Sequence, residues 1–393
     1  MRKVRAVLAA VVAAPLVAGC GGGGGGVTLH WYVGQESSGS YREAAQRCTD
    51  SSNGRYRIAM EALPNNADAQ RQLVVRRLAA RDRTVDLIGM DVIWTAEFAE
   101  AGWLRPWVGA RGAQVSAGVL AGPLATARYR GTLWAAPFTS NSQLLWYRKS
   151  RTGTVPTTWD ELISAAEALP RGQQVVAVQG ARYEGYTVWV NSLLASAGTE
   201  LVADADRPDR ARAGLAAGPT EQDTRRAMLS GAASYSLNYP AVYAAARAEQ
   251  PGLVDDLGWA RYPEVVAGRP SRPPLGGINL GVSAYSPHPE QAFDAAACLR
   301  SEANQELGAT RGSLPPTIAA LYDDPAVARQ FPFGRLLRES IAAAAPRPAT
   351  PAYADVSLAV QQVLHPPASV DPARDVPGLR RTIDDALASK ALL

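Results

Sequence analysis

Short apolar runs and longer amphipathic stretches alternate along the first hundred positions of this chain. The runs have the length of buried strands, and the stretches place apolar residues at helical spacing. In chain order they predict strand, helix, strand, helix, strand and helix over residues 27–33, 40–48, 57–63, 67–80, 85–90 and 93–101. This order predicts an α/β protein that begins with a parallel sheet.

The rest of the chain predicts further elements of both kinds. Strands are expected at 133–138, 144–147, 174–179 and 276–282. Helices are expected at 158–169, 187–197, 289–299, 334–345 and 353–364, and a turn at 312–316. A proline-rich joint over 346–351 separates the last two helices, because proline cannot continue a helix from within.

The N-terminus has the pattern of a secretory signal peptide. Basic Arg2, Lys3 and Arg5 precede an apolar stretch over 4–17, which is shorter than the roughly 20 residues of a spanning helix. The stretch ends in the lipobox LVAGC, so residues 1–20 are expected to be processed and Cys20 to be lipidated. The glycines at 21–26 then form a flexible tether. The alternative is a core helix that contains Cys20 by chance.

Charge and composition exclude several classes of function. The chain has 40 Lys and Arg against 36 Asp and Glu, a net charge of +4, and removing the three basic residues of the signal segment leaves +1. A nearly neutral chain has no electrostatic footprint for nucleic acid. Its three histidines are scattered, with no HExxH pair, and no CxxC, Walker loop or GxSxG motif is present, so no metal or cofactor is expected.

Several segments resemble one family of proteins. DLIGMDVIW (86–94), LWAAPFTSN (133–141), WDEL (159–162), GGINLGV (276–282) and RGSLP (311–315) are similar to the extracellular sugar-binding proteins of ABC importers, the maltodextrin-binding class. Three further runs resemble the LpqY-like trehalose-binding lipoproteins of mycobacteria within that class. They are DVIWTAEFAEAGWL (91–104), RYEGYTVWVNSLL (182–194) and LNYPAVY (237–243).

The resemblance implies a two-lobed periplasmic-binding-protein fold of type II, with a ligand cleft between lobes that hinge strands join. Lobe 1 would comprise 27–136 plus 282–320, and lobe 2 would comprise 137–281 plus 321–393. Such a monomer would capture a neutral disaccharide by closing its hinge, and the three runs named above favour trehalose as that disaccharide. It would deliver the sugar to membrane permease subunits. One departure is the segment at 199–228, which is shorter and more charged than the family pattern and puts the packing of lobe 2 in question.

Two cysteines remain after Cys20. In an oxidising compartment Cys48 and Cys298 are able to form a disulfide, although spacing alone equally allows two buried thiols. The resemblance places the helices that carry them in lobe 1 and so implies that they pair.

Sugars need carboxylate, amide or guanidinium partners for their hydroxyls and aromatic rings for their C–H faces. Asp91 is the strongest candidate, because packing poorly explains an acid directly after the apolar run VDLIGM. The complete set of expected ligand-binding residues is Gln35, Glu36, Asn66, Asp91, Trp94, Asn141, Glu184, Trp189, Asn238, Tyr239, Gly277, Asn279 and Arg311.

Some of these residues have simpler explanations. Trp94 and Trp189 lie on helical stretches, where an aromatic side chain is commonly part of the core. Glu36 is placed to cap the helix after it, and Gly276 with Gly277 fits a bulge. An alternative function is a secreted glycoside hydrolase that uses two of the acids Glu36, Asp91 and Glu184, and another is a binding protein for a different small solute.

Overall fold

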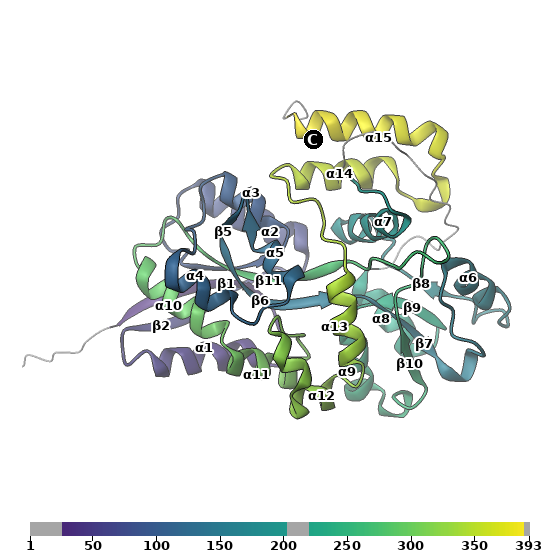
Figure 1. The fold of residues 1–393 in the computed structure, drawn as a ribbon, viewed down its shortest axis with the longest axis horizontal. Helices are drawn as coiled ribbons and strands as arrows, with labels where there is room; N and C mark the ends of the chain where they lie inside the picture. The colour runs from purple at the N-terminus through teal and green to yellow at the C-terminus, as the bar shows by residue number, and fades with distance from the viewer. Residues whose placement is uncertain (1–25, 203–219, 389–393) are drawn as a thin grey trace, which may run out of the picture.

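Two β-sheets covered by helices organise the chain in a computed structural model, which describes residues 26–202 and 220–388 (Figure 1). The predicted signal segment, Cys20 and most of the glycine tether lie outside the described residues. Within the described part, no helix is long and apolar enough to cross a membrane.

The first sheet has five strands in the order β2-β1-β3-β11-β6. Their bounds are β1 Val27–Gly34, β2 Tyr56–Leu63, β3 Leu87–Asp91, β6 Ala135–Ser142 and β11 Leu275–Val282. β1 pairs in parallel with β2 and β3, as the sequence pattern predicts, whereas β11 runs antiparallel to β3 and β6. Apolar side chains of these strands, among them Trp31, Leu87 and Phe138, form one buried core with the surrounding helices.

Helices cover this sheet on both sides. They are α1 Ser40–Ser51, α2 Ala67–Ala79, α3 Trp94–Glu100, α4 Gly109–Ser116, α5 Ala121–Thr126, α10 Pro289–Leu299 and α11 Glu302–Gly312. A disulfide joins Cys48 of α1 to Cys298 of α10, as the resemblance implies, across 250 residues of sequence. It ties together two helices that pack side by side.

The second sheet has four strands in the order β10-β7-β9-β8, with bounds β7 Leu144–Arg148, β8 Val176–Ala177, β9 Tyr235–Asn238 and β10 Leu257–Ala260. Both of its faces are buried, because Leu145 and Leu237 point into one core while Leu144 and Trp146 point into another. The helices over the two faces are α6 Trp159–Glu167, α7 Glu184–Ala197, α8 Glu221–Ser230, α9 Ala241–Glu249, α12 Pro325–Gln330, α13 Gly334–Ala343, α14 Tyr353–Val363 and α15 Pro372–Leu387.

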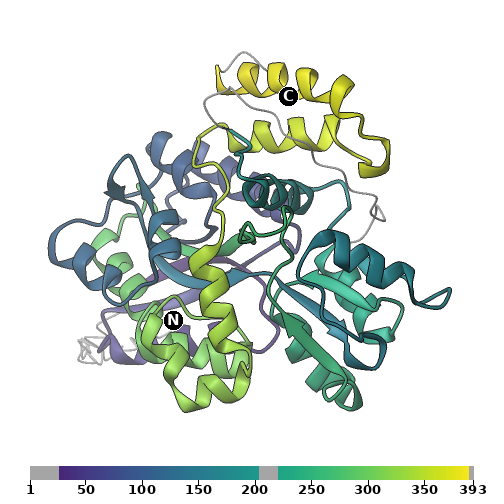
Figure 2. The ribbon, with the colours of Figure 1, turned by 45° about the vertical axis from the view of Figure 1, so that its right-hand side comes forward.

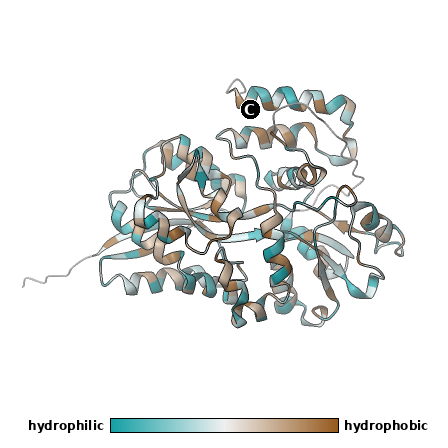
Figure 3. Cartoon of the chain, in the orientation of Figure 1, coloured by the Kyte–Doolittle hydropathy of each residue, from teal (hydrophilic) through white to brown (hydrophobic). Residues whose placement is uncertain are grey.

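Short elements complete the described chain: β4 Arg128–Tyr129, β5 Thr132–Leu133, and the 3₁₀ turns η1 Lys149–Arg151, η2 Pro251–Leu253, η3 Ala319–Asp323 and η4 Pro367–Ser369. α14 packs against α7, with α15 outside it (Figure 2). α15 has polar residues along its outer side, and brown apolar residues concentrate on the strands and inner helix faces (Figure 3).

The two sheets are joined at several points of the chain. The shortest connection is Gln143, which alone separates β6 of the first sheet from β7 of the second. The expected lobe boundaries at 136 and 282 fall inside β6 and at the end of β11. Both strands belong to the first sheet, where they pair with each other along most of their length. The structure therefore carries the first sheet a few residues further toward the second than the family pattern implied.

Candidate ligand-binding cleft

The guanidinium of Arg347 lies between the two sheets. Arg347 belongs to the proline-rich joint between α13 and α14, and its side chain is only 4% exposed. Nη2 donates to Oδ1 of Asp91 at 2.6 Å, and Nη1 donates to Oε1 of Glu184 at 2.6 Å. Asp91 ends β3 of the first sheet and Glu184 begins α7 over the second. One buried arginine therefore holds a carboxylate from each lobe.

The position of each carboxylate follows from its own element. Asp91 stands at the carboxyl end of β3, where its Oδ1 also accepts the backbone N–H of Ile93 at 3.1 Å. Glu184 is the first residue of α7, where the helix dipole favours a negative charge. The hydroxyl of Tyr353 donates to the same Oε1 at 2.6 Å. No described protein group donates to Oδ2 of Asp91 or Oε2 of Glu184, so one oxygen of each remains for a ligand.

A hollow of about 180 Å³ opens beside this bridge. Asp68 and Arg71 of α2 and Trp94 of α3 line it from lobe 1, and α7 and α14 line it from lobe 2. Arg71 is engaged by Glu97 in two bonds of 2.5 and 2.7 Å. The hollow is smaller than the roughly 300 to 1,000 Å³ of typical small-molecule sites.

A second group of polar residues faces the bridge from lobe 2. Glu221 is the first residue of α8 and lies near Tyr183, and Tyr239 directly follows β9. The ring of Tyr239 lies beside the backbone of Gly276 in β11, a strand of the first sheet. The charges of Asp91 and Arg347 act on both Glu221 and Tyr239, which places these side chains near the bridge.

Burial and crowded charge raise the pKa of the two lobe 2 carboxyls. Burial raises the pKa of Glu184, Arg347 opposes that rise, and Asp91 adds to it. Burial likewise raises the pKa of Glu221, against the hydrogen bond of Tyr183. The guanidinium of Arg347 thus bonds two carboxyls, Asp91 and Glu184, and the third, Glu221, lies near enough for its pKa to respond to the charges of Asp91 and Arg347.

The structure brings several of the expected residues to this cleft. Asp91 and Glu184 form the bridge with Arg347, and Tyr239 lies near it. Trp94, largely buried against Phe98, lines the adjacent hollow. Asn141 pairs with Gly276 in the β6–β11 ladder near Tyr239, and its Oδ1 accepts the N–H of Ser142 at 3.0 Å.

Gly277 has a backbone explanation. Its φ is 140°, and a Cβ there would lie 2.3 Å from the carbonyl oxygen of Thr139. The register of the β6–β11 ladder shifts at the next residue, Ile278. Glycine is therefore required by this irregularity itself, as the bulge interpretation predicted.

Three expected residues at the surface of lobe 1 are occupied locally. Oxygens of Glu36 accept from Ser38, Ser40 and Tyr41 at the start of α1, and Oδ1 of Asn66 accepts the N–H of Ala69 and so caps α2. Arg311 is half-exposed, pairs with Glu43 and donates to the carbonyl of Ser38. The polar groups of these three residues already have partners within a few residues or across one helix pair, so the proposed site does not include them.

Three more expected residues are buried inside the lobes. Nδ2 of Asn238 donates to the carbonyl of Glu221 and to Thr224, which fixes the start of α8. Nδ2 of Asn279 lies 3.3 Å from the hydroxyls of Thr95 and Thr126. Trp189 packs between Trp159 and Tyr186 in the core of lobe 2. These side chains hold the walls of the cleft and do not form its surface.

The residues that sequence reasoning missed are Asp68, Tyr183, Glu221, Arg347 and Tyr353. Arg347 had the least signal, because it stands between Pro346 and Pro348 in a joint with no predicted element. Glu184 and Glu221 share one detectable property, since each is an acid at the first residue of a helix. That pattern marks a helix start far more often than a binding site, so it could not have identified the cleft.

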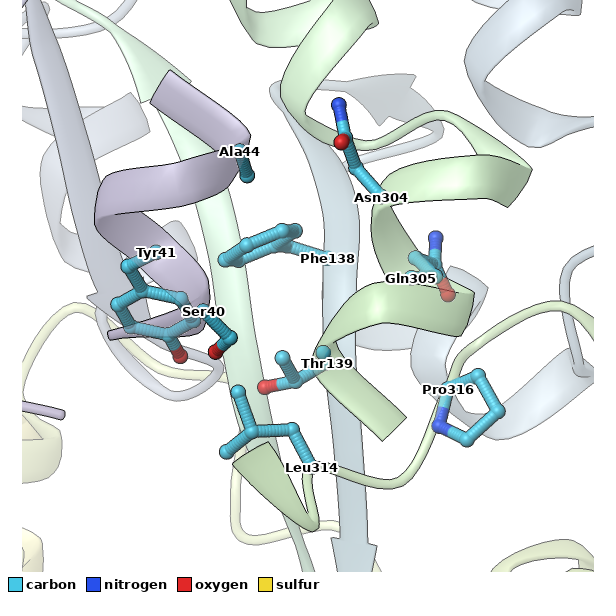
Figure 4. A pocket seen from close by; sticks show the side chains of 10 residues that line it. Ser40, Tyr41, Ala44, Phe138, Thr139, Asn304, Gln305, Leu314 and Pro316 are labelled. Carbon is cyan, nitrogen blue, oxygen red and sulfur yellow. The ribbon is translucent and has the colours of Figure 1, made fainter. Parts of the chain in front are cut away.

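Two other hollows lie within lobe 1. The one between α1, β6 and α11 has a volume of only about 10 Å³, with Tyr41, Phe138 and Leu314 closing it (Figure 4), which is room for a single water at most. An open surface hollow of about 610 Å³ lies beside α1, β1 and β2, where Gln35 and Glu36 form part of its wall. Neither has a wall from both lobes, as closure around a ligand requires.

The sequence profile of one protein family, described as bacterial extracellular solute-binding protein, matches residues 64–306, more than half of the chain. The chain belongs to this family. A probable ABC transporter-binding protein of Deinococcus radiodurans is 28% identical over 324 residues, which cover 75% of this chain and 76% of that protein.

Solved structures of solute-binding proteins share the fold. Maltose-bound MalE3 of T. maritima superimposes with a TM-score of 0.80 at 22% identity, over 93% of this chain and all of that chain. The GacH receptor of Streptomyces glaucescens, solved unliganded and with acarbose, has a TM-score of 0.77 at 19% identity, over 93% of this chain and 100% of its own. These matches confirm the two-lobed type II fold predicted from the sequence.

Membership of the solute-binding family also decides between two of the functions that the sequence left open. The protein is an extracytoplasmic binding protein and not a glycoside hydrolase. In the structure, two of the acids that could have served as a catalytic pair, Asp91 and Glu184, are both bonded by the single guanidinium of Arg347.

Proposed function

We propose that this protein is the substrate-binding component of an ABC importer, that it captures a neutral disaccharide between its lobes, and that trehalose is this disaccharide. The observation that carries the proposal is the pair Asp91 and Glu184, one from each lobe, held by Arg347 with one free oxygen each. A solute that bonds both oxygens stabilises the closed form by its higher affinity for it.

The chemistry of the cleft suits a sugar. Carboxylate oxygens accept hydrogen bonds from hydroxyls, and the phenol rings of Tyr239 and Tyr353 offer apolar faces for C–H groups. A phosphorylated or carboxylated solute would meet the carboxyls of Asp91 and Glu184, whose one shared cation, Arg347, is already paired with both, and would be repelled. The relatives support the same class, since MalE3 was solved with maltose and GacH with acarbose.

The choice of trehalose depends on three sequence runs. These runs, 91–104, 182–194 and 237–243, resemble the mycobacterial trehalose-binding lipoproteins, and each contributes one residue to the cleft: Asp91, Glu184 and Tyr239. Runs that are distant in sequence converge on one place, which supports a shared ligand.

We further propose that the chain is anchored to the outer face of the cytoplasmic membrane by lipid on Cys20. Cys20→Ala should leave the precursor unprocessed and unacylated, because the sulfur of Cys20 is the atom that receives the lipid. Detergent-phase partitioning and intact-mass measurement test this. Recovery of the variant in the detergent phase with the lipid-modified mass of the wild type would refute the anchor.

Calorimetric titration with trehalose, maltose and glucose tests the binding function. Trehalose should bind with the highest affinity and should be recovered intact, as chromatography of the incubated sugar would show. Tighter binding of maltose would refute trehalose as the ligand and keep the sugar class. Absence of heat with all three sugars, from protein with a cooperative thermal transition, would refute the sugar class itself.

A further inference from the structure

We infer that Arg347 is a positioning residue, which fixes one oxygen of Asp91 and one of Glu184 so that their other oxygens bond the same sugar. This inference rests on the proposed function and adds the residue that makes the two lobes act as one site. Arg347 is neither a member of a resembling motif nor a residue with a predicted role. Its assignment depends on the tertiary structure alone.

The backbone just before Arg347 and the guanidinium itself are held in place. Nδ2 of Asn191, on α7, donates to the carbonyl of Pro346 at 3.3 Å, and Ala345 forms a bridge with Pro274 just before β11. Beyond the joint, the Arg347 guanidinium carbon lies 5.8 Å from the ring centre of Tyr353. An arginine fixed in this way loses little further freedom when it bonds the carboxylates.

The pattern of donors decides which oxygens are free. Oδ1 of Asp91 accepts from Arg347 and from the N–H of Ile93, and Oε1 of Glu184 accepts from Arg347 and Tyr353. Each carboxylate thus has one oxygen with two donors and one with none among the described groups. Two donors on one oxygen restrict the rotation of the carboxylate, so its second oxygen is largely positioned before the sugar arrives.

Charged and titratable groups surround the bridge on every side. Beside Asp91, Glu184 and Arg347 themselves, they are Asp68 and Arg71 of α2, Glu97 of α3, Tyr183 before α7, Glu221 of α8, Tyr239 after β9 and Tyr353 of α14. Arg71 is engaged by Glu97, so Arg347 is the cation in direct contact with both bridge carboxylates.

The consequence for pH can be derived with its sign. Arg347 lowers the pKa of Glu184 against burial and against Asp91, so removing the guanidinium raises that pKa further. If the sugar needs the ionised carboxylate, affinity is lost as pH falls through the pKa of Glu184. The loss should therefore begin at a higher pH in a variant without the arginine.

The test is calorimetric titration with trehalose, maltose and glucose at several pH values between about 5 and 8, using wild type, Arg347→Gln, Arg347→Lys and Arg300→Gln. Arg300 is the matched control, a buried arginine of lobe 1 that donates to the carbonyls of Gln114 and Ala117. Thermal unfolding of each variant reports on folding separately.

Arg347→Gln should weaken sugar binding by roughly 10- to 100-fold near neutral pH and by more at lower pH. Arg347→Lys keeps the charge but not the two-pronged geometry, so it should restore the pH profile and only part of the affinity. Arg300→Gln should lower thermal stability and leave the affinity within about twofold of wild type.

The possible failures are distinct. Sugar binding by wild type with an unchanged affinity in Arg347→Gln would overturn the inference. An equal loss at every pH in both Arg347 variants would also overturn it, because it would show a packing role without control of the carboxylates. No binding by wild type would refute the proposed function instead.

Discussion

Asp91 and Glu36 occupy matching places in the first sheet, yet the structure uses them differently. Asp91 is the last residue of β3, and Glu36 comes two residues after the end of β1. The two strands are neighbours in the sheet. Among the described residues, Glu36 accepts hydrogen bonds from Ser38, Ser40 and Tyr41, all within five residues. Asp91 is bonded by Arg347, which lies 256 residues away.

The difference shows how local and distant donors divide the oxygens of an acid at a strand end. Burial acts to raise the pKa of Glu36, but its three local donors outweigh burial and hold the pKa below the ordinary value. Each oxygen of Glu36 therefore has a donor from the start of α1. At Asp91 the distant arginine takes one oxygen and joins the acid to the other lobe, and the second oxygen has no donor among the described residues. This contrast is the reason why Asp91, and not Glu36, belongs to the proposed site.

The largest expected effect concerns the disulfide on the Glu36 side of the molecule. Replacing both Cys48 and Cys298 with Ala should lower the free energy of unfolding by about 2 to 5 kcal/mol. The disulfide joins residues 250 positions apart, so without it the unfolded chain gains conformational entropy. Sugar affinity should stay within about twofold, since the cleft lies elsewhere. Chemical denaturation and calorimetry check the two expectations, and peptide mapping under non-reducing conditions checks the bond. A large loss of affinity would show that the two regions are not separate.

Asp91→Ala should have the next largest effect, on binding. Losing this partner leaves a sugar hydroxyl and part of the Arg347 fork unpaired, which costs about 1.5 to 3 kcal/mol, or roughly 10- to 100-fold in affinity. Calorimetric titration with trehalose measures it. Binding as tight as that of wild type would remove Asp91 from the site and with it the contrast to Glu36.

Glu36→Gln is the counterpart at the other strand end. It should cost about 1 kcal/mol of stability, the size of a lost helix cap, and leave sugar affinity unchanged. Because the folded pKa of Glu36 is lowered, its contribution is present above the unfolded pKa and is lost as pH falls through the folded one. Unfolding curves of wild type and variant should therefore differ at neutral pH and converge at acidic pH. A tenfold drop in affinity would instead return Glu36 to the binding site.

Arg311→Ala should have the smallest effect. Its guanidinium is half-exposed and paired with Glu43, and exposed ion pairs contribute about 0.2 to 1 kcal/mol. The original expectation of a sugar-binding Arg311 predicts a large loss of affinity, whereas the structure predicts a change below about twofold. Because Glu43 contacts Arg311, the double variant with Glu43→Ala tests whether the two side chains act only on each other.

The elements were predicted more completely than the site. The strands at 27–33 and 57–63 and the helices at 289–299 and 353–364 agree with β1, β2, α10 and α14 within a few residues, because their hydrophobic periods are regular. α7 begins at Glu184, three residues before the prediction, which is why this acid was not recognised as a helix start. β9 and α15 were missed, the first for its short length and the second for its polar, proline-containing sequence.

The sequence by itself determined which residues are apolar, where most helices and strands begin, and, through the resemblance of several segments, that two lobes would enclose a cleft. Local patterns suffice for this, because periodicity and caps depend on near neighbours. Only the tertiary structure decided which polar groups remain available. Asp91, Glu184 and Arg347 are separated by up to 256 residues and meet where the lobes face each other, whereas Glu36 and Asn66 find their partners within a few residues. The competition between near and distant donors for the same oxygens has no trace in the sequence, because it depends on distances that folding alone sets.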